Sequence, residues 1–225
     1  MDQKWRRRNW VIPVVIPLLL FILFNTFYSA PLLRRSMIQE KENQIKDMTE
    51  MGVSILAHFH SMEEAGELTR REAQRQAISL ILDVRFGPQN RDYYWINDFE
   101  PSLIAHSFRP DLVGVDLQTE EHDEFRRLLE SFVAIAELEG EGFTRYQWQY
   151  YDERDRTEPK ISYVKEFEPW GWIIGTGMYV DDIERAARSQ RNINVIFVIS
   201  ALQLLLAGYV LYRIMENRKR KKRQE

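Results

Sequence analysis

The residues best suited to binding chemistry are one lysine and several aromatic side chains on predicted strands. Side chains alternate between the two faces of a strand, so Lys165 shares a face with Tyr163. On the preceding strand, the same alternation gives an aromatic face that contains Tyr146 and Trp148. A cation beside aromatic walls is typical of a small-ligand pocket, which is mostly apolar with a few placed polar groups. The alternative is that the rings form the core and that Lys165 extends its ammonium to the domain edge.

A second aromatic segment, residues 92–99, adds candidates for the same pocket. Trp95 and Asn97 share one face of this predicted strand, and Tyr94 points to the other face unless a β-bulge intervenes. His106 ends the short strand that follows. It is either a further pocket residue or an ordinary core or surface histidine.

Catalytic and metal-binding patterns are missing from the sequence. The chain has no cysteine, which excludes disulfides and thiol chemistry. His58 and His60 are two residues apart on a predicted helix, so they do not face each other as a metal pair would. The sequence contains neither a phosphate-binding glycine loop nor a G-x-S-x-G motif. We therefore expect a protein that is not an enzyme and that uses no cofactor.

Two uncharged, mainly apolar runs, residues 10–28 and 193–212, frame the chain. At about 1.5 Å per residue, each reaches roughly the 30 Å thickness of a bilayer core. Basic residues precede the first run and follow the second, which predicts cytoplasmic termini and an external middle. The expected layout in the inner membrane is a basic N-terminus (1–9), a first span (10–30), an extracytoplasmic domain (31–191), a second span (192–212) and a basic tail (213–225).

The net charge of −3 hides an uneven distribution. Residues 1–30 carry +3 and residues 213–225 carry +5, whereas residues 31–191 carry 20 Lys/Arg against 31 Asp/Glu, or −11. The basic ends suit anionic membrane lipid as a partner. The acidic middle makes nucleic acid an unsuitable one.

The elements that must position the pocket residues follow from periodicity and turn signals. Strands are predicted at residues 92–99, 103–106, 143–151, 160–167 and 172–180, with a charged turn at 152–159. Helices are predicted at residues 34–62, 69–84 and 116–141, the second opened by a capping box from Thr69 to Glu72. This order indicates an α+β fold, with an antiparallel sheet of about five strands and helices on one side.

The first predicted helix has two interpretations. Its apolar residues, among them Ile38, Ile45 and Ile55, are spaced close to a heptad. The helix either packs on its own domain or forms the seam of a homodimer.

Several motifs, taken in order, resemble a single Cache domain of the Cache type 2 family. The first half is carried by L-T-x-x-E-A-Q from residue 68, R-F-G from residue 85 and D-Y-Y-W-I-N-D from residue 92. The second half is carried by G-E-G-F from residue 140, K-I-S-Y-V-K from residue 160 and P-W-G-W-I-I-G-T-G-M-Y-V-D-D from residue 169. The resemblance spans about residues 34–190.

This resemblance implies a PAS-like sensor with a long N-terminal helix, as in bacterial chemoreceptors and histidine kinases. It implies a small organic acid as ligand, such as acetate, propionate, pyruvate or lactate, and a homodimer. The pocket residues that it implies are Tyr94, Trp95, Asn97, His106, Tyr146, Trp148, Tyr163 and Lys165.

Only 13 residues follow the second predicted span, so we expect signalling through a separate cytoplasmic kinase, chemoreceptor or cyclase, or a chain that is part of a longer receptor. Two other functions stay open. One is an aromatic cage for a cationic ligand. The other is a structural membrane protein that acts through protein contacts.

Overall fold

The computed structural model describes residues 17, 20, 21, 23–117, 119 and 122–180, together with 192, 195–196, 198–200, 202–203, 206–210, 213–215 and 218. The chain divides into two compact units, residues 36–183 and a unit formed by residues 1–35 and 184–225. In the part of the chain that is described, no helix combines the length and apolarity needed to cross a membrane. Much of the two predicted spans lies outside the described residues, so these spans stay predictions.

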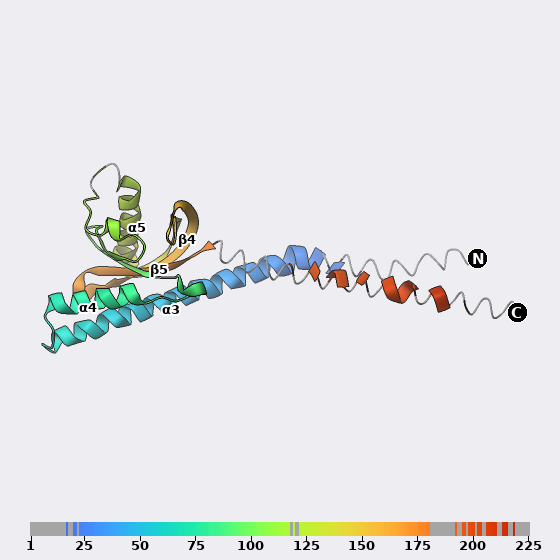
Figure 1. Ribbon diagram of the computed structural model, residues 1–225, viewed down its shortest axis with the longest axis horizontal. Helices are drawn as coiled ribbons and strands as arrows, with labels where there is room; N and C mark the ends of the chain where they lie inside the picture. Colours follow the sequence, from blue (N-terminus) through green and yellow to red (C-terminus); the bar gives the residue numbers. More distant parts are fainter. Residues whose placement is uncertain are drawn as a thin grey trace. The chain divides into compact units, whose positions relative to one another are not determined.

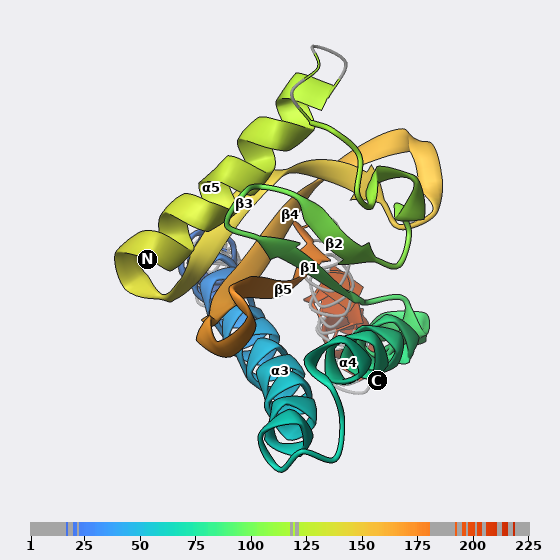
Figure 2. The ribbon, with the colours of Figure 1, turned by 90° about the vertical axis from the view of Figure 1, so that its left-hand side faces the viewer.

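The unit of residues 36–183 is a five-stranded antiparallel sheet with helices on both faces (Figures 1 and 2). Helices α3 (Ala30–Glu64) and α4 (Arg70–Asp83) pack on one face, and α5 (Asp123–Glu139) packs on the other. The prediction of helices on one side is therefore wrong. The reason lies in the central strand β5 (Trp172–Tyr179), which is buried at every position and so requires cover on both faces.

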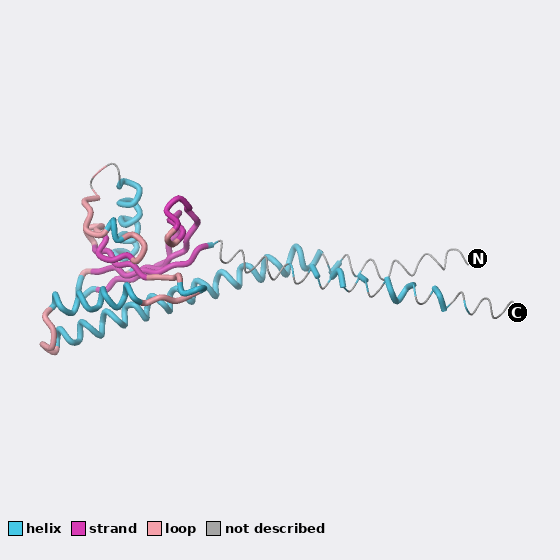
Figure 3. Tube along the Cα trace, in the orientation of Figure 1, coloured by secondary structure: helices cyan, strands magenta, loops and turns pink. Residues whose placement is uncertain are grey.

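The sheet confirms the five predicted strands, in the spatial order β2-β1-β5-β4-β3. Figure 3 draws these strands in magenta. The remaining strands are β1 (Tyr94–Asp98), β2 (Leu103–His106), β3 (Glu141–Tyr150) and β4 (Glu153–Phe167).

The predicted charged turn at residues 152–159 is wrong, because β4 already begins at Glu153. A tight turn at Tyr151 and Asp152 joins β3 to β4, and Tyr151 adopts the left-handed region with a φ of 51°. Residues 153–159 pair with β3 but not with β5, so their charged side chains reach water. Pro159 fits at this position because it has no backbone N–H, and here the strand has no second neighbouring strand that would need one.

The helix signals are confirmed in most respects. Thr69 and Glu72 form the capping box that opens α4. On α3, Ile45 and Leu56 are buried, and Ile38 and Ile55 pack against their own domain. These contacts favour the interpretation in which the helix lies on its own sheet. A homodimer stays a prediction.

Candidate ligand-binding site

The most unusual residue of the domain is Lys160, a fully buried lysine on the α5 face of β4. Only 1% of its surface is exposed. Its Nζ donates to the hydroxyl of Tyr93 at 2.9 Å and lies 4.1 Å from the centroid of the Tyr93 ring. The rings of Trp95 and Tyr179 are each 5.3 Å from the same atom. No carboxylate in the described ranges forms an ion pair with it.

Burial without a paired anion disfavours the charged form of Lys160. Burial lowers the pKa of its ammonium from 10.5 to about 7, although the negative charge of Asp92 acts in the opposite direction. Asp92 itself accepts a hydrogen bond from the hydroxyl of Tyr151 at 2.9 Å.

Two glycines of β5 allow the close packing around this lysine. A Cβ on Gly175 would lie 2.4 Å from the Trp95 ring. A Cβ on Gly177 would lie 2.1 Å from Ser162 Oγ and 3.0 Å from Lys160 Cε. Gly175 and Gly177 are therefore needed so that the side chains of Trp95, Ser162 and Lys160 can approach the β5 backbone.

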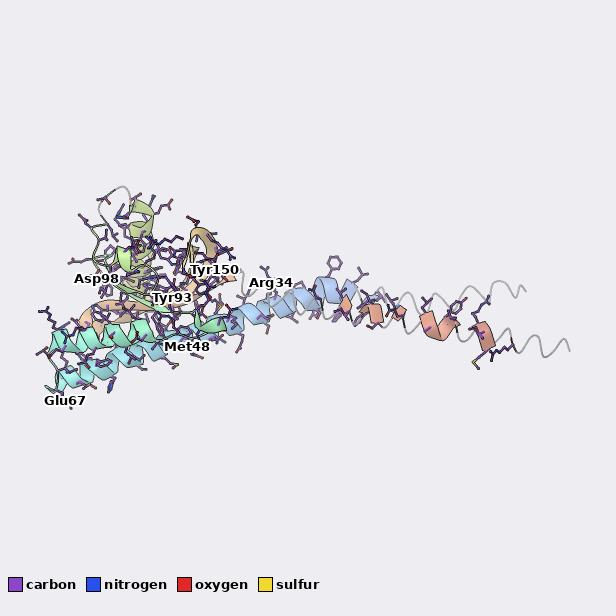
Figure 4. The ribbon with its side chains drawn as sticks, in the orientation of Figure 1. Arg34, Met48, Glu67, Tyr93, Asp98 and Tyr150 are labelled. Atoms are coloured by element: carbon purple, nitrogen blue, oxygen red, sulfur yellow. The ribbon has the colours of Figure 1, made fainter. Side chains whose placement is uncertain are left out.

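Hydrogen-bond donors outnumber acceptors around Lys160. The Tyr93 hydroxyl (Tyr93 is labelled in Figure 4) accepts from Lys160 Nζ and also from Trp148 Nε1, at 3.1 Å. The indole nitrogen of Trp95 is buried and has no hydrogen-bond partner among the described residues. An ammonium has three donors, of which one is used here. Unmatched donors on a buried cation are suited to the oxygens of an anion.

His106 joins this group in its neutral form. Its ring centroid lies 4.9 Å from that of Tyr93 and 5.7 Å from that of Trp148. The Nδ1 atom accepts from the backbone N–H groups of Phe108 and Arg109, at 3.1 and 3.0 Å. Burial, followed by the positive charges of Lys160 and Arg109, holds the His106 pKa well below 6.5. The neutral ring therefore carries its hydrogen on Nε2.

Tyr146 and Trp148 connect the site to helix α5. Tyr146 is directly opposite Lys160 in the β3–β4 register, and its hydroxyl lies 3.0 Å from Ser162 Oγ. Its ring is 5.4 Å from that of Phe132 on α5, and the Trp148 ring is 5.6 Å from that of Phe125 on the same helix. Helix α5 thus covers the aromatic face.

The structure brings together Trp95, His106, Tyr146 and Trp148, four of the eight predicted site residues. Asn97 is buried on the same face two residues along β1, where its amide donates to the Asp98 carbonyl at 3.0 Å. Ligand binding by these residues stays a prediction.

The other three predicted site residues lie on the opposite face, against α3. Lys165 Nζ lies 2.6 Å from a carboxylate oxygen of Glu50 and 2.7 Å from one of Glu141. The Glu141 contact is an ion pair by distance but does not have the geometry of a hydrogen bond. The Tyr163 ring packs on Phe143 at 4.6 Å. The Tyr94 hydroxyl donates to the Met48 carbonyl at 2.6 Å (Met48 is labelled in Figure 4). The expectation that Lys165 faces Tyr146 and Trp148 is therefore wrong.

Sequence reasoning missed the central residues of the site, namely Tyr93, Lys160, Ser162 and Tyr179. Turn length alone gives no signal for Lys160. With a two-residue turn at Tyr151 and Asp152, Tyr150 pairs with Glu153, and regular pairing from there would set Tyr146 opposite Thr157. A register shift between Gln149 and Tyr150 instead sets Lys160 opposite Tyr146, on the aromatic face.

Comparison with known proteins identifies the fold and its relatives. A sequence model described as single Cache domain 2 matches residues 37–192. The chemotaxis protein McpP of Pseudomonas putida, a methyl-accepting protein, is 32% identical over 210 residues, which are 92% of this chain and 37% of McpP. The sensor histidine kinase MctS of Rhizobium johnstonii is 28% identical over 207 residues, 85% of this chain and 43% of MctS. The chain thus spans less than half the length of these relatives.

Solved structures agree with this assignment. One, described as the structural basis for carboxylic acid recognition by a Cache chemosensory domain, is 34% identical and has a TM-score of 0.59. The match covers 65% of this chain and 97% of that one. A periplasmic sensor domain of a chemotaxis protein is 30% identical, also with a TM-score of 0.59, over 64% of this chain and 98% of that one.

Proposed function

Because this chain belongs to the single Cache domain 2 family, we propose that it is a membrane-anchored receptor that binds a short carboxylate at Lys160. The ligand class includes acetate, propionate, pyruvate and lactate. In this proposal the sensor domain is extracytoplasmic, the basic ends contact anionic lipid, and a separate cytoplasmic kinase, chemoreceptor or cyclase receives the signal. The protein is a receptor and not an enzyme.

The observation that carries the proposal is the buried ammonium with too few acceptors. Lys160 has one hydroxyl acceptor at 2.9 Å, and the nearby Trp95 indole N–H has none among the described residues. A carboxylate supplies two oxygens and a compensating charge. Charge-assisted hydrogen bonds in a desolvated site are about twice as strong as neutral ones.

The long-range field of the domain opposes an anion, since residues 31–191 carry −11. Attraction must therefore act at short range, inside the buried group, where water does not screen it. A solved relative described as recognising carboxylic acids supports the same ligand class.

The affinity expected for such a ligand is modest. Acetate has four non-hydrogen atoms, and the ceiling of about 1.5 kcal/mol per atom gives roughly 6 kcal/mol. That corresponds to a Kd on the order of tens of micromolar at best.

The test is thermal unfolding of the purified full chain with and without acetate. At about 100 times the Kd, a ligand adds about 2.7 kcal/mol to the unfolding free energy, or roughly 5–10 °C in Tm. Lys160→Met should abolish this shift. Its Tm without ligand should be equal or higher, because replacing a buried charge by an apolar side chain of similar volume is often neutral or stabilising.

Lys165→Met is the matched control, since it removes a lysine from the same strand on the other face. It should keep the acetate shift. An unchanged shift in Lys160→Met would refute the proposal. A shift with choline but not with acetate would instead favour a cation cage, and the absence of a shift with any small molecule would favour a structural role.

A further inference from the structure

The charge state of Lys160 in the empty site determines whether the site responds to a carboxylate anion or to the undissociated acid. Its ammonium is enclosed by three rings and one hydroxyl, and no described carboxylate forms an ion pair with it. An unpaired charge in such surroundings is unfavourable, so the neutral amine is a major form of the empty site. A carboxylate needs the ammonium.

We infer that a carboxylate binds to Lys160 together with one proton from solvent wherever the empty site holds the neutral amine, so that the site then measures the undissociated acid and not the anion. This inference rests on the proposed function. The neutral amine lone pair of Nζ takes up the proton, and the resulting ammonium pairs with the carboxylate. The site is neutral before binding, and the ion pair formed from one anion and one proton is neutral afterwards.

Other titratable groups that face Lys160 do not provide this proton. On β1 and β5, burial raises the pKa values of Tyr93 and Tyr179, the latter to about 12, and burial likewise raises that of Tyr146 on β3. On β2, His106 stays neutral for the reasons given above.

The charged groups around the site already have partners. Asp92, the carboxylate that acts on Lys160 electrostatically, accepts from the Tyr151 hydroxyl. Beyond β2, Arg109 Nε donates to both oxygens of Asp111, each at 3.1 Å. The proton must therefore come from solvent.

The functional consequence is a receptor whose response combines ligand and pH. With a pKa of about 7 for Lys160 in the empty site, the affinity is nearly constant at lower pH. Above that value it falls tenfold per pH unit. At a fixed acetate concentration, the occupied fraction then follows the concentration of acetic acid, the form without charge.

Titration calorimetry with acetate on the full chain tests the inference. Measurements in phosphate and in Tris, which differ in ionisation heat, give the number of protons taken up per acetate bound. We expect close to zero protons near pH 6 and close to one near pH 8.5. The Kd should weaken about 30-fold between these pH values. Lys165→Met should show the same proton uptake.

Three outcomes overturn the inference. Acetate that binds with an unchanged Kd and no proton uptake near pH 8.5 refutes it and leaves the proposed function intact. Proton-coupled binding that persists in Lys160→Met refutes Lys160 as the acceptor. Absence of acetate binding at every pH refutes the inference and the proposed function together.

Discussion

At the scale of single residues, the site is defined by what Lys160 and Trp95 lack. Lys160 has a hydroxyl where a buried ammonium requires an anion, and the Trp95 N–H has no acceptor among the described residues. Unsatisfied buried donors are unfavourable for folding, which makes their presence a sign of function. Both residues lie on the face covered by α5, with Lys160 Nζ 5.3 Å from the centroid of the Trp95 ring.

Trp95→Phe tests the indole donor separately from the ring. The ring packing against Phe132 is largely retained, while the N–H is lost. Loss of a hydrogen bond to a charged oxygen costs about 1.5–3 kcal/mol, so acetate should bind about 10- to 100-fold more weakly by calorimetry. Little stability should be lost, since the N–H makes no hydrogen bond in the described free protein. Unchanged acetate affinity would exclude this N–H from the ligand contact.

At the scale of elements, β4 connects the site to helix α3. Lys160 lies on one face of this strand, and Lys165 lies on the other, where it contacts Glu50 of α3. Glu141, at the start of β3, contacts both Lys165 and Lys46 of α3, at 2.7 and 2.8 Å. In the proposed function, a displacement of β4 would therefore reach the helix through these ion pairs.

Glu141→Gln tests this connection by its pH dependence. Lys165, Lys46 and Tyr163 lower the pKa of Glu141 from 4.5 to about 2. A lowered carboxyl pKa adds stability that is complete above pH 4.5 and is lost as the pH falls towards 2. Since the pairs are partly exposed, Glu141→Gln should lose about 1 kcal/mol at pH 7.

The measurement is chemical denaturation followed by tryptophan fluorescence. The difference between Glu141→Gln and the unmodified chain should shrink between pH 4.5 and 2, because protonated Glu141 resembles glutamine. The exposed Glu137→Gln on α5 is the control and should behave like the unmodified chain. A difference that is constant with pH would contradict the assigned role of the Glu141 charge.

At the scale of the whole molecule, the chain is an acidic Cache domain between basic ends. The proposed signalling through α3 would need a coupling free energy of only about 1–3 kcal/mol. A homodimer stays a prediction, and it would have to leave the sheet-facing residues of α3 in place. Ile45 and Leu56 are buried in the domain, whereas Met51 on the same helix is 57% exposed.

Met51→Cys tests homodimerisation through the outer face of α3. The native chain has no cysteine, so a single thiol reports one position. If α3 pairs with the α3 of a second copy, mild oxidation should give a disulfide-linked dimer on a non-reducing gel. Ala134→Cys, at an exposed position on α5, should remain monomeric. A Met51→Cys chain that stays monomeric, or equal cross-linking of both variants, would argue against a seam at this face.

Much of the fold could be read from local signals. The capping box at Thr69, the aromatic strand of Trp95 and the buried strand that starts at Trp172 each depend on neighbours in sequence. The family motifs then identified the domain over most of its length. Likewise, the contrast between an acidic middle and basic ends is a property of the sequence alone.

Which lysine belongs to the site was decided only by the tertiary structure. Alternation assigns Lys160 and Lys165 to opposite faces of β4, but period-two patterns do not say which face meets Tyr146. The register shift between Gln149 and Tyr150 decides this by setting Lys160 opposite Tyr146. The packing of α5 on one face and of α3 on the other then gives each lysine its environment. Lys160 is buried among aromatic rings and Lys165 forms an ion pair with α3 because different helices pack on the two faces of β4. Those helices lie far from β4 in the sequence.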